Sequence, residues 1–140
     1  MATAADAELV LRLYELRREE TLRRARKFLL FDFKPRTVQE LRIVTRNVEV
    51  PENTHWRQAL SYWEMAASFV LRGALDVDLF LDSNGEGLIL YAKYHHWHAE
   101  TEKESGSPFM KNTAAMIEKF PAAKARYEAF LKVFGPDEKK

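Results

Sequence analysis

The sequence contains no cysteine, and it has only five glycines and five prolines among 140 residues. The absence of cysteine excludes disulfide bonds, thiol catalysis and metal sites built on thiolates. So few glycines and prolines exclude a collagen-like or low-complexity chain. No apolar run reaches the ~18 residues of a membrane-spanning helix, and no basic segment precedes an apolar one at the start, as a secretory signal requires. We therefore expect a cytoplasmic protein without a membrane partner.

An excess of charge of one sign is also missing, because 22 basic side chains face 21 acidic ones and the net charge is +1. This balance excludes a strongly basic nucleic-acid binder as a description of the whole chain. The balance is nevertheless a sum of three blocks, with net charges of +3 for residues 1–50, −5 for residues 51–106 and +3 for residues 107–140. Opposite blocks can meet within the fold or across a subunit interface, so we expect a homo-oligomer or a protein partner and no nucleic acid.

Helical periodicity is what the sequence has in abundance. Apolar residues recur at steps of three and four, and no strand-like alternation of useful length occurs. The expected helices cover residues 6–31, 37–48, 53–73, 76–81, 86–103, 108–119 and 122–134. The 46% of hydrophobic residues suffice for one core at this length. The sequence therefore predicts an all-α, single-domain helical bundle of about five to seven helices over residues 1–140, with a frayed tail at residues 136–140.

Capping residues define most of the expected helix ends. The expected N-caps are Asp6, Thr37 with Glu40 in a capping box, Asn53 or Thr54, Asp76, and Ser107 before Pro108. Short polar side chains at these positions accept hydrogen bonds from the free N–H groups of the first turn. Gly73 suits the C-terminal end of the 53–73 helix. The core seam of that helix is expected at Trp56, Leu60, Trp63, Ala67, Val70 and Ala74.

The expected first helix is apolar on two opposite sides. One side carries Leu9, Leu13 and Leu16, and the other carries Leu11, Leu22, Ala25 and Leu29. A helix of this kind often lies between two partners. The helix is also rich in arginine, but Glu15, Glu19 and Glu20 dilute its charge too much for a nucleic-acid surface. The leading hypothesis is therefore a non-enzymatic soluble protein that acts through self-association or a protein partner.

One polar cluster stands out as a candidate ligand-binding site. Tyr91, His95, His98 and Glu102 share one sector of the 86–103 helix, and Glu64 on another helix is the candidate acid–base partner. Two imidazoles and a carboxylate can bind a divalent ion, but one helix rarely completes such a site. We therefore assign no metal, no cofactor and no catalytic residue. An ion pair with an arginine of the first helix is the preferred alternative for Glu64, and a small-molecule or divalent-metal-binding helical domain is the alternative function.

A second stretch, residues 82–89, imitates the start of a calcium-binding loop. Asp82, Asn84 and Glu86 occupy the first, third and fifth positions, and Gly87 follows at the sixth. The twelfth position is Lys93, where the bidentate glutamate should be. We therefore expect a turn and a helix N-terminus, with Glu86 in the first turn. Catalytic triads and glycine-rich phosphate loops are absent, and the aromatic residues at helical spacing are typical of a core.

Three segments resemble a known family. Residues 13–20 read Leu-Tyr-Glu-Leu-Arg-Arg-Glu-Glu and precede Arg-Ala-Arg at 24–26; residues 62–70 read Tyr-Trp-Glu-Met-Ala-Ala-Ser-Phe-Val; Gly-Ala-Leu-Asp at 73–76 leads through Leu-Phe at 79–80 to Gly-Glu at 85–86. Together they resemble a family of small bacterial helical proteins, a domain of unknown function. The resemblance implies an uncharacterised, all-helical bacterial protein and supplies no catalytic residues. It also implies that some relatives carry a membrane anchor, which this sequence does not show.

Overall fold

Helices make up the regular secondary structure of residues 1–136, which is the part of the chain that the computed structural model describes. The α-helices are α1 (Ala4–Arg17), α2 (Glu20–Lys27), α3 (Val38–Arg46), α4 (Pro51–Leu71), α5 (Val77–Ser83), α6 (Glu86–Tyr94), α7 (Ala99–Ser105), α8 (Lys111–Lys119) and α9 (Pro121–Phe134). A π-helical turn (Phe28–Asp32) follows α2, and a 3-10 turn (His95–His98) follows α6. No strand occurs within residues 1–136, which confirms the all-α, single-domain class. Apart from Pro136, the expected frayed tail lies outside the described residues.

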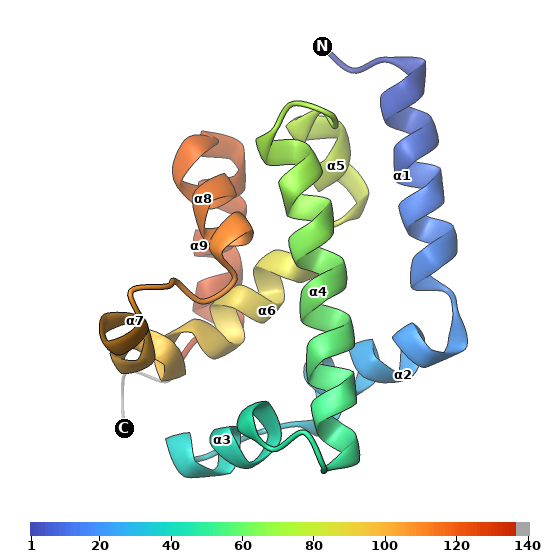
Figure 1. Cartoon of the computed structure of the whole chain (residues 1–140). Helices are drawn as coiled ribbons and strands as arrows, with labels where there is room; N and C mark the ends of the chain where they lie inside the picture. Colours follow the sequence, from blue (N-terminus) through green and yellow to red (C-terminus); the bar gives the residue numbers. More distant parts are fainter. Residues whose placement is uncertain (137–140) are drawn as a thin grey trace.

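Helix α4 occupies the centre of the domain. It contacts α2, α3, α6 and α8, and Figure 1 shows it between the α1–α2 arm and the pair α8 and α9. The fully buried members of the expected seam are Trp56, Trp63, Ala67 and Val70. Leu60 is only partly buried, whereas Ala74 is exposed and the neighbouring Leu75 enters the core instead. Within residues 1–136, no helix is both long and apolar enough to cross a bilayer.

The two ends of α4 differ from each other in how they form. The expected cap at Asn53 or Thr54 is wrong, because the helix already begins at Pro51. Proline suits a first helical position, where its missing N–H is not needed. The buried Asn53 amide instead donates to the Val44 carbonyl at 2.7 Å. The C-terminal end forms as expected, since Gly73 has a φ of 82° and closes a left-handed cap that few other residues adopt without strain.

The expected continuous helix over residues 6–31 is wrong, since it breaks between Arg17 and Glu20. The Glu19 carboxylate accepts hydrogen bonds from the N–H groups of Thr21 and Leu22 at 3.0 Å each, and so starts α2. A straight helix with apolar residues on opposite sides could turn only one of them to the core. The break lets α2 pack against α4 while α1 contacts α5, so both apolar sides contribute buried residues.

The start of α1 also differs from the expectation. Thr3, and not Asp6, is the N-cap, and Asp6 closes a capping box with it from the third helical position. The other Asp6 oxygen accepts the N–H of Asp76 at 3.0 Å, which ties α1 to the start of α5. These hydrogen bonds, above all the one from the Thr3 backbone, lower the pKa of Asp6. The expected caps Thr37 for α3 and Asp76 for α5 are confirmed.

The expected helices over residues 86–103 and 108–119 are corrected in a related way. The first is divided by the 3-10 turn into α6 and α7, so two interrupted helices explain why the described residues hold nine α-helices and not seven. The second begins only at Lys111, and neither Ser107 nor Pro108 starts it. Met110 precedes α8 with a φ of 47°, a left-handed conformation that is unfavourable for a methionine. The surrounding contacts therefore determine this helix start.

We predict that replacing Gly87 with alanine destabilises the protein. A glycine-to-alanine change in a helix usually stabilises by about 0.5–1 kcal/mol. The added Cβ at Gly87 would lie 3.1 Å from the Cβ of Trp63, which cannot swing away. We expect a loss of about 1–2 kcal/mol in unfolding free energy from this overpacking. Urea denaturation measures it, with Gly85→Ala as the control, since its Cβ would meet the outer ring atoms of Phe130 and the end of the Arg126 side chain, which can move away. Equal or higher stability of Gly87→Ala would contradict the packing argument.

Candidate functional site

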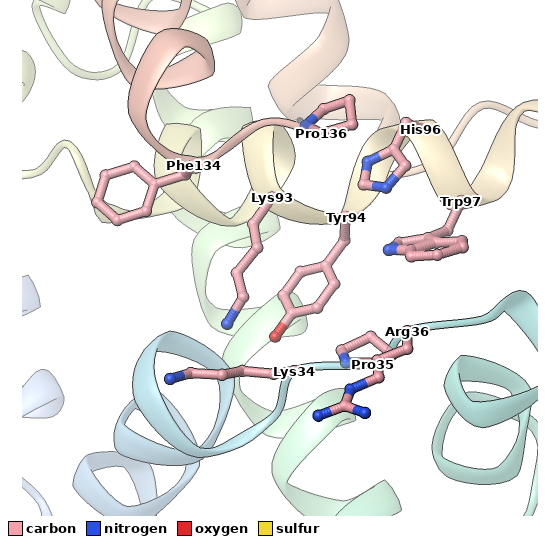
Figure 2. Close-up of a pocket in the computed structure, with 9 residues that line it drawn as sticks. All are labelled: Lys34, Pro35, Arg36, Lys93, Tyr94, His96, Trp97, Phe134 and Pro136. Carbon is pink, nitrogen blue, oxygen red and sulfur yellow. The ribbon is translucent and has the colours of Figure 1, made fainter. Parts of the chain in front are cut away.

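A cleft of about 810 Å³ opens beside α6, the 3-10 turn and the end of α9. Its lining residues are Lys34, Pro35, Arg36, Lys93, Tyr94, His96, Trp97, Phe134 and Pro136. Figure 2 shows the residues of the loop after the π-helical turn on one side, and His96, Trp97, Phe134 and Pro136 on the opposite side. The side chains of Lys93 and Tyr94 extend between the two sides. The cleft is therefore assembled from segments that are far apart in the sequence.

Lys93 and Tyr94 hold the two sides of the cleft together. The Lys93 ammonium donates to the carbonyls of Leu29 and Phe33 at 2.7 and 2.9 Å, and the Tyr94 hydroxyl donates to the Leu29 carbonyl at 2.6 Å. A helix leaves its last carbonyls without hydrogen-bond donors. The Lys93 and Tyr94 side chains supply these donors at the end of the π-helical turn. Burial lowers the pKa of Lys93 to about 8, and the nearby Lys34 adds to this effect.

The polar character of the cleft is cationic. Among the described residues, the side chains of Lys34 and Arg36 form no ion pair and no hydrogen bond; Arg36 is held only through its backbone N–H, which donates to Glu40 at 2.7 Å. Within residues 1–136, no residue that lines the cleft is acidic. Burial, together with the charges of His95 and His98, lowers the pKa of His96, so this imidazole is neutral at pH 7. In the described part of the chain, the cleft thus presents three cations, Lys34, Arg36 and Lys93, and no acidic lining residue.

The sequence reasoning missed this site. Its signal is the run Lys34-Pro35-Arg36, in which two cations flank a proline that ends a helical segment. Proline forces extended backbone there and removes the residues from helical packing. The remaining walls come from positions that read as core or tail, such as Trp97 and Phe134. Only the tertiary structure brings them opposite the cationic run.

The structure brings Tyr91, His95 and Glu102 of the predicted cluster together. His95 stacks on Tyr91 with a ring distance of 4.5 Å, and its Nε2 lies 3.2 Å from the Glu102 carboxylate. The same carboxylate oxygen accepts the N–H of Phe109 at 2.8 Å. Burial raises the pKa of the Tyr91 hydroxyl to about 12, and the negative charge of Glu102 contributes. At neutral pH this group therefore holds the segment before α8 and offers no ionised tyrosine.

His98, the fourth member of the predicted cluster, is held by contacts with Phe109 and Tyr94. Its ring stacks on Phe109 at 4.0 Å, and its Nδ1 donates to the Tyr94 carbonyl at 3.0 Å. Burial lowers the pKa of His98, although the bond to Tyr94 and the charge of Glu102 oppose this. Within the described side chains, no three histidine and acidic residues are arranged to hold a metal ion. The cluster is therefore occupied by its own internal contacts.

Among the described residues, Glu64 forms no hydrogen bond or ion pair with a histidine, and its carboxylate caps helix α8. Its carboxylate accepts the N–H groups of Asn112 and Thr113 at 3.0 and 2.9 Å, and the Thr113 hydroxyl at 2.7 Å. The expected ion pair with an arginine of the first helix is wrong. The reason is that α8 begins after Met110, whose side chain has no oxygen to accept from the N–H groups of the first turn. A carboxylate at a helix N-terminus also interacts favourably with the helix dipole.

In the calcium-like stretch, the side-chain oxygens of Asn84 and Glu86 bind arginines. Glu86 lies in the first turn of α6, as expected, and forms a bidentate pair with Arg26 at 2.9 and 2.8 Å. The Asn84 side chain is buried and accepts from Arg17 at 3.4 Å. The expectation of a turn and a helix N-terminus is confirmed. The pair also shows that the basic first block and the acidic middle block of the chain meet within the fold.

We predict that stability rises with pH above about pH 8 because of Lys93. Its pKa is about 8 when folded and 10.5 in its ordinary state, so in this window the unfolded chain binds the extra proton and stability increases with pH. Above pH 10 the trend reverses, because burial raises the pKa of Tyr62 and Tyr91 to about 12. Urea denaturation at pH 7 to 11 measures both limbs. In Lys93→Met the rise should vanish and the fall remain; an unchanged rise would show that another group causes it.

Comparison with known proteins identifies the family. The family model described as a domain of unknown function, DUF4760, matches residues 2–120. No curated protein and no solved structure matches the chain. The match covers the lining residues from Lys34 to Trp97 and stops before α9, which supplies Phe134. Because the match spans most of its length, the chain belongs to the DUF4760 family, a domain of unknown function, as the resemblance of its three segments implied.

Proposed function

We propose that this protein is a non-enzymatic binding protein for a small organic molecule, and that the cleft beside α6 is its binding site. The observation that carries this proposal is the cleft itself, whose volume of about 810 Å³ falls in the range of ~300–1,000 Å³ typical of ligand sites. Trp97 and Phe134 provide apolar walls, and a few cations provide polar contacts. A binding site of this class commonly combines apolar walls with a small number of polar groups.

The chemistry of the lining favours binding over catalysis. General acid–base catalysis needs two titratable groups within reach of the substrate and with matched pKa values. No carboxylate of residues 1–136 lines the cleft, and the Lys93 ammonium already donates to backbone carbonyls. The candidates of the sequence reasoning, Glu64 and His98 among them, are engaged in the helix contacts described above. A ligand in this cleft would meet groups that hold it and no group placed to transform it.

We predict that Trp97→Ala weakens the binding of a neutral aromatic probe, N-phenyl-1-naphthylamine, whose fluorescence rises in apolar surroundings. Removing one aromatic wall should raise Kd about tenfold, since an aromatic contact and its buried area are together worth about 1.5 kcal/mol. Tyr14→Ala is the matched control, because Tyr14 is a half-exposed aromatic on α1 and does not line the cleft. No saturable binding to the wild type, or an equal loss in both variants, would overturn the proposed site.

A second candidate, self-association, has its own observation. Leu11 and Tyr14 on α1 are 62% and 46% exposed, and Leu16, on the opposite side of the helix, lines a groove of about 410 Å³ together with Leu22, Tyr62 and Met65 among others. The exposed apolar side chains and the groove of one copy can complement those of a second copy. The flanking charges carry both signs, with Glu8 and Glu15 among Arg12 and Arg18, which fits a second copy of the chain better than a strongly charged partner.

Bacterial origin and a cytoplasmic location stay predictions.

We predict that the wild type sediments as a dimer at micromolar concentration and that Leu11→Glu dissociates it. A buried charge at the centre of the contact lacks a partner and weakens association. Ile43→Glu is the matched control, because Ile43 is equally exposed at 60% but lies on α3. Analytical ultracentrifugation measures the mass. A wild type with the mass of one chain, or equal dissociation by both variants, would remove this candidate.

A further inference from the structure

We infer that the ligand of this cleft is an amphipathic organic anion, in which a carboxylate, sulfonate or phosphate is attached to a planar apolar group. This inference rests on the proposed function and adds the class of the ligand to it. Three features of the cleft support the inference independently: its cations without an ion pair, its small number of hydrogen-bond acceptors, and the separation of Lys34 and Arg36 from Trp97 and Phe134.

The first feature is charge. Lys34, Arg36 and Lys93 line one cleft, and no ion pair joins their side chains to a carboxylate among the described residues. Two arginines earlier in the chain do have a carboxylate partner, Arg24 with Glu20 and Arg26 with Glu86. Like charges held together raise the free energy of the protein, and an anion lowers it again. Asp32 is the acidic group that acts on Lys93, and its effect is smaller than those of burial and Lys34.

The second feature is the kind of hydrogen bond that the lining can make. Within residues 1–136, the side chains that line the cleft include no aspartate, glutamate, asparagine, glutamine, serine or threonine. The lysine and arginine side chains are donors only. The side-chain acceptors are one nitrogen of the neutral His96 imidazole and the oxygen of the Tyr94 hydroxyl, whose proton is donated to the Leu29 carbonyl. A ligand rich in donors, such as a sugar or an amine, would find few acceptors here. A ligand with several acceptor oxygens and a negative charge matches the donors.

The third feature is the arrangement of the two kinds of wall. Lys34 and Arg36 belong to the loop on one side, and Trp97 and Phe134 belong to the opposite side (Figure 2). A free phosphate would fill only a small part of about 810 Å³ and would leave the aromatic walls in water. A molecule with an anionic end toward the loop and a flat apolar end against an aromatic side chain of the opposite side uses both sides. Arginine is well suited to such a group, because its planar fork binds oxyanions in a bidentate way.

The test compares two probes that differ in one anionic group, 8-anilino-1-naphthalenesulfonate and the neutral N-phenyl-1-naphthylamine. We expect the wild type to bind the sulfonate at least about tenfold more tightly, the effect of one charge-assisted contact. The variant Lys34→Gln/Arg36→Gln should lose this preference and keep its affinity for the neutral probe. The control Lys124→Gln, on the exposed start of α9, should behave as the wild type. Added salt should weaken only the sulfonate.

The outcomes separate this inference from the proposed function. If neither probe binds, the proposed function fails; if both bind equally and the double variant changes nothing, only the anionic class fails. Because the sulfonate also binds partly unfolded chains, thermal unfolding of each variant must show an intact cooperative transition. Naphthalene-1-carboxylate and 1-naphthyl phosphate then distinguish the anions. Tighter binding of the phosphate assigns the site to phosphate esters, and equal binding assigns it to carboxylates and phosphates alike.

Discussion

The backbone groups at helix ends are the constraint on which this structure depends. A chain folded into short helices has many ends, and each leaves N–H or C=O groups without a partner. Charged side chains from other helices meet several of these groups: Glu64 at the start of α8, Asp6 at the start of α5, and Lys93 at the end of the π-helical turn. Helices of seven to nine residues are marginal in isolation. Each long-range cap therefore fixes both the helix and its place in the fold.

The same constraint explains why the cleft exists. Lys93 and Tyr94 bind the carbonyls that end the π-helical turn, and Pro35 cannot continue a helix after it. The chain must then cross to α3 as an extended loop, on which the side chains of Lys34 and Arg36 form no ion pair. Burial removes the Lys93 ammonium from water and lowers its pKa, and the charge of the nearby Lys34 adds to this effect. The contacts that hold the loop thus leave Lys34 and Arg36 in the lining of the cleft.

The sequence predicted the class of the fold because periodicity is local. Trp56, Trp63 and Val70 recur at helical spacing, and they form the core seam of α4 as expected. The breaks at Glu19 and at the 3-10 turn could not be predicted in the same way, since they depend on which apolar side finds a partner. Caps that lie three residues from the N–H that they bind, such as Asp76, were predictable, whereas Glu64 lies 48 and 49 residues before the N–H groups that it binds. Only the tertiary structure shows that Glu64 lies beside the start of α8.

The candidate site follows the same division. Tyr91, His95, His98 and Glu102 were conspicuous because they are chemically versatile residues on one stretch of sequence, and three of them do meet. The Glu102 carboxylate, however, binds both His95 and the Phe109 N–H, and His98 binds the Tyr94 carbonyl. A buried polar group that is already satisfied has little left for a ligand. Lys34 and Arg36 were inconspicuous in the sequence, but they line a cleft with their charges unmatched, and unmatched groups are what a ligand can bind.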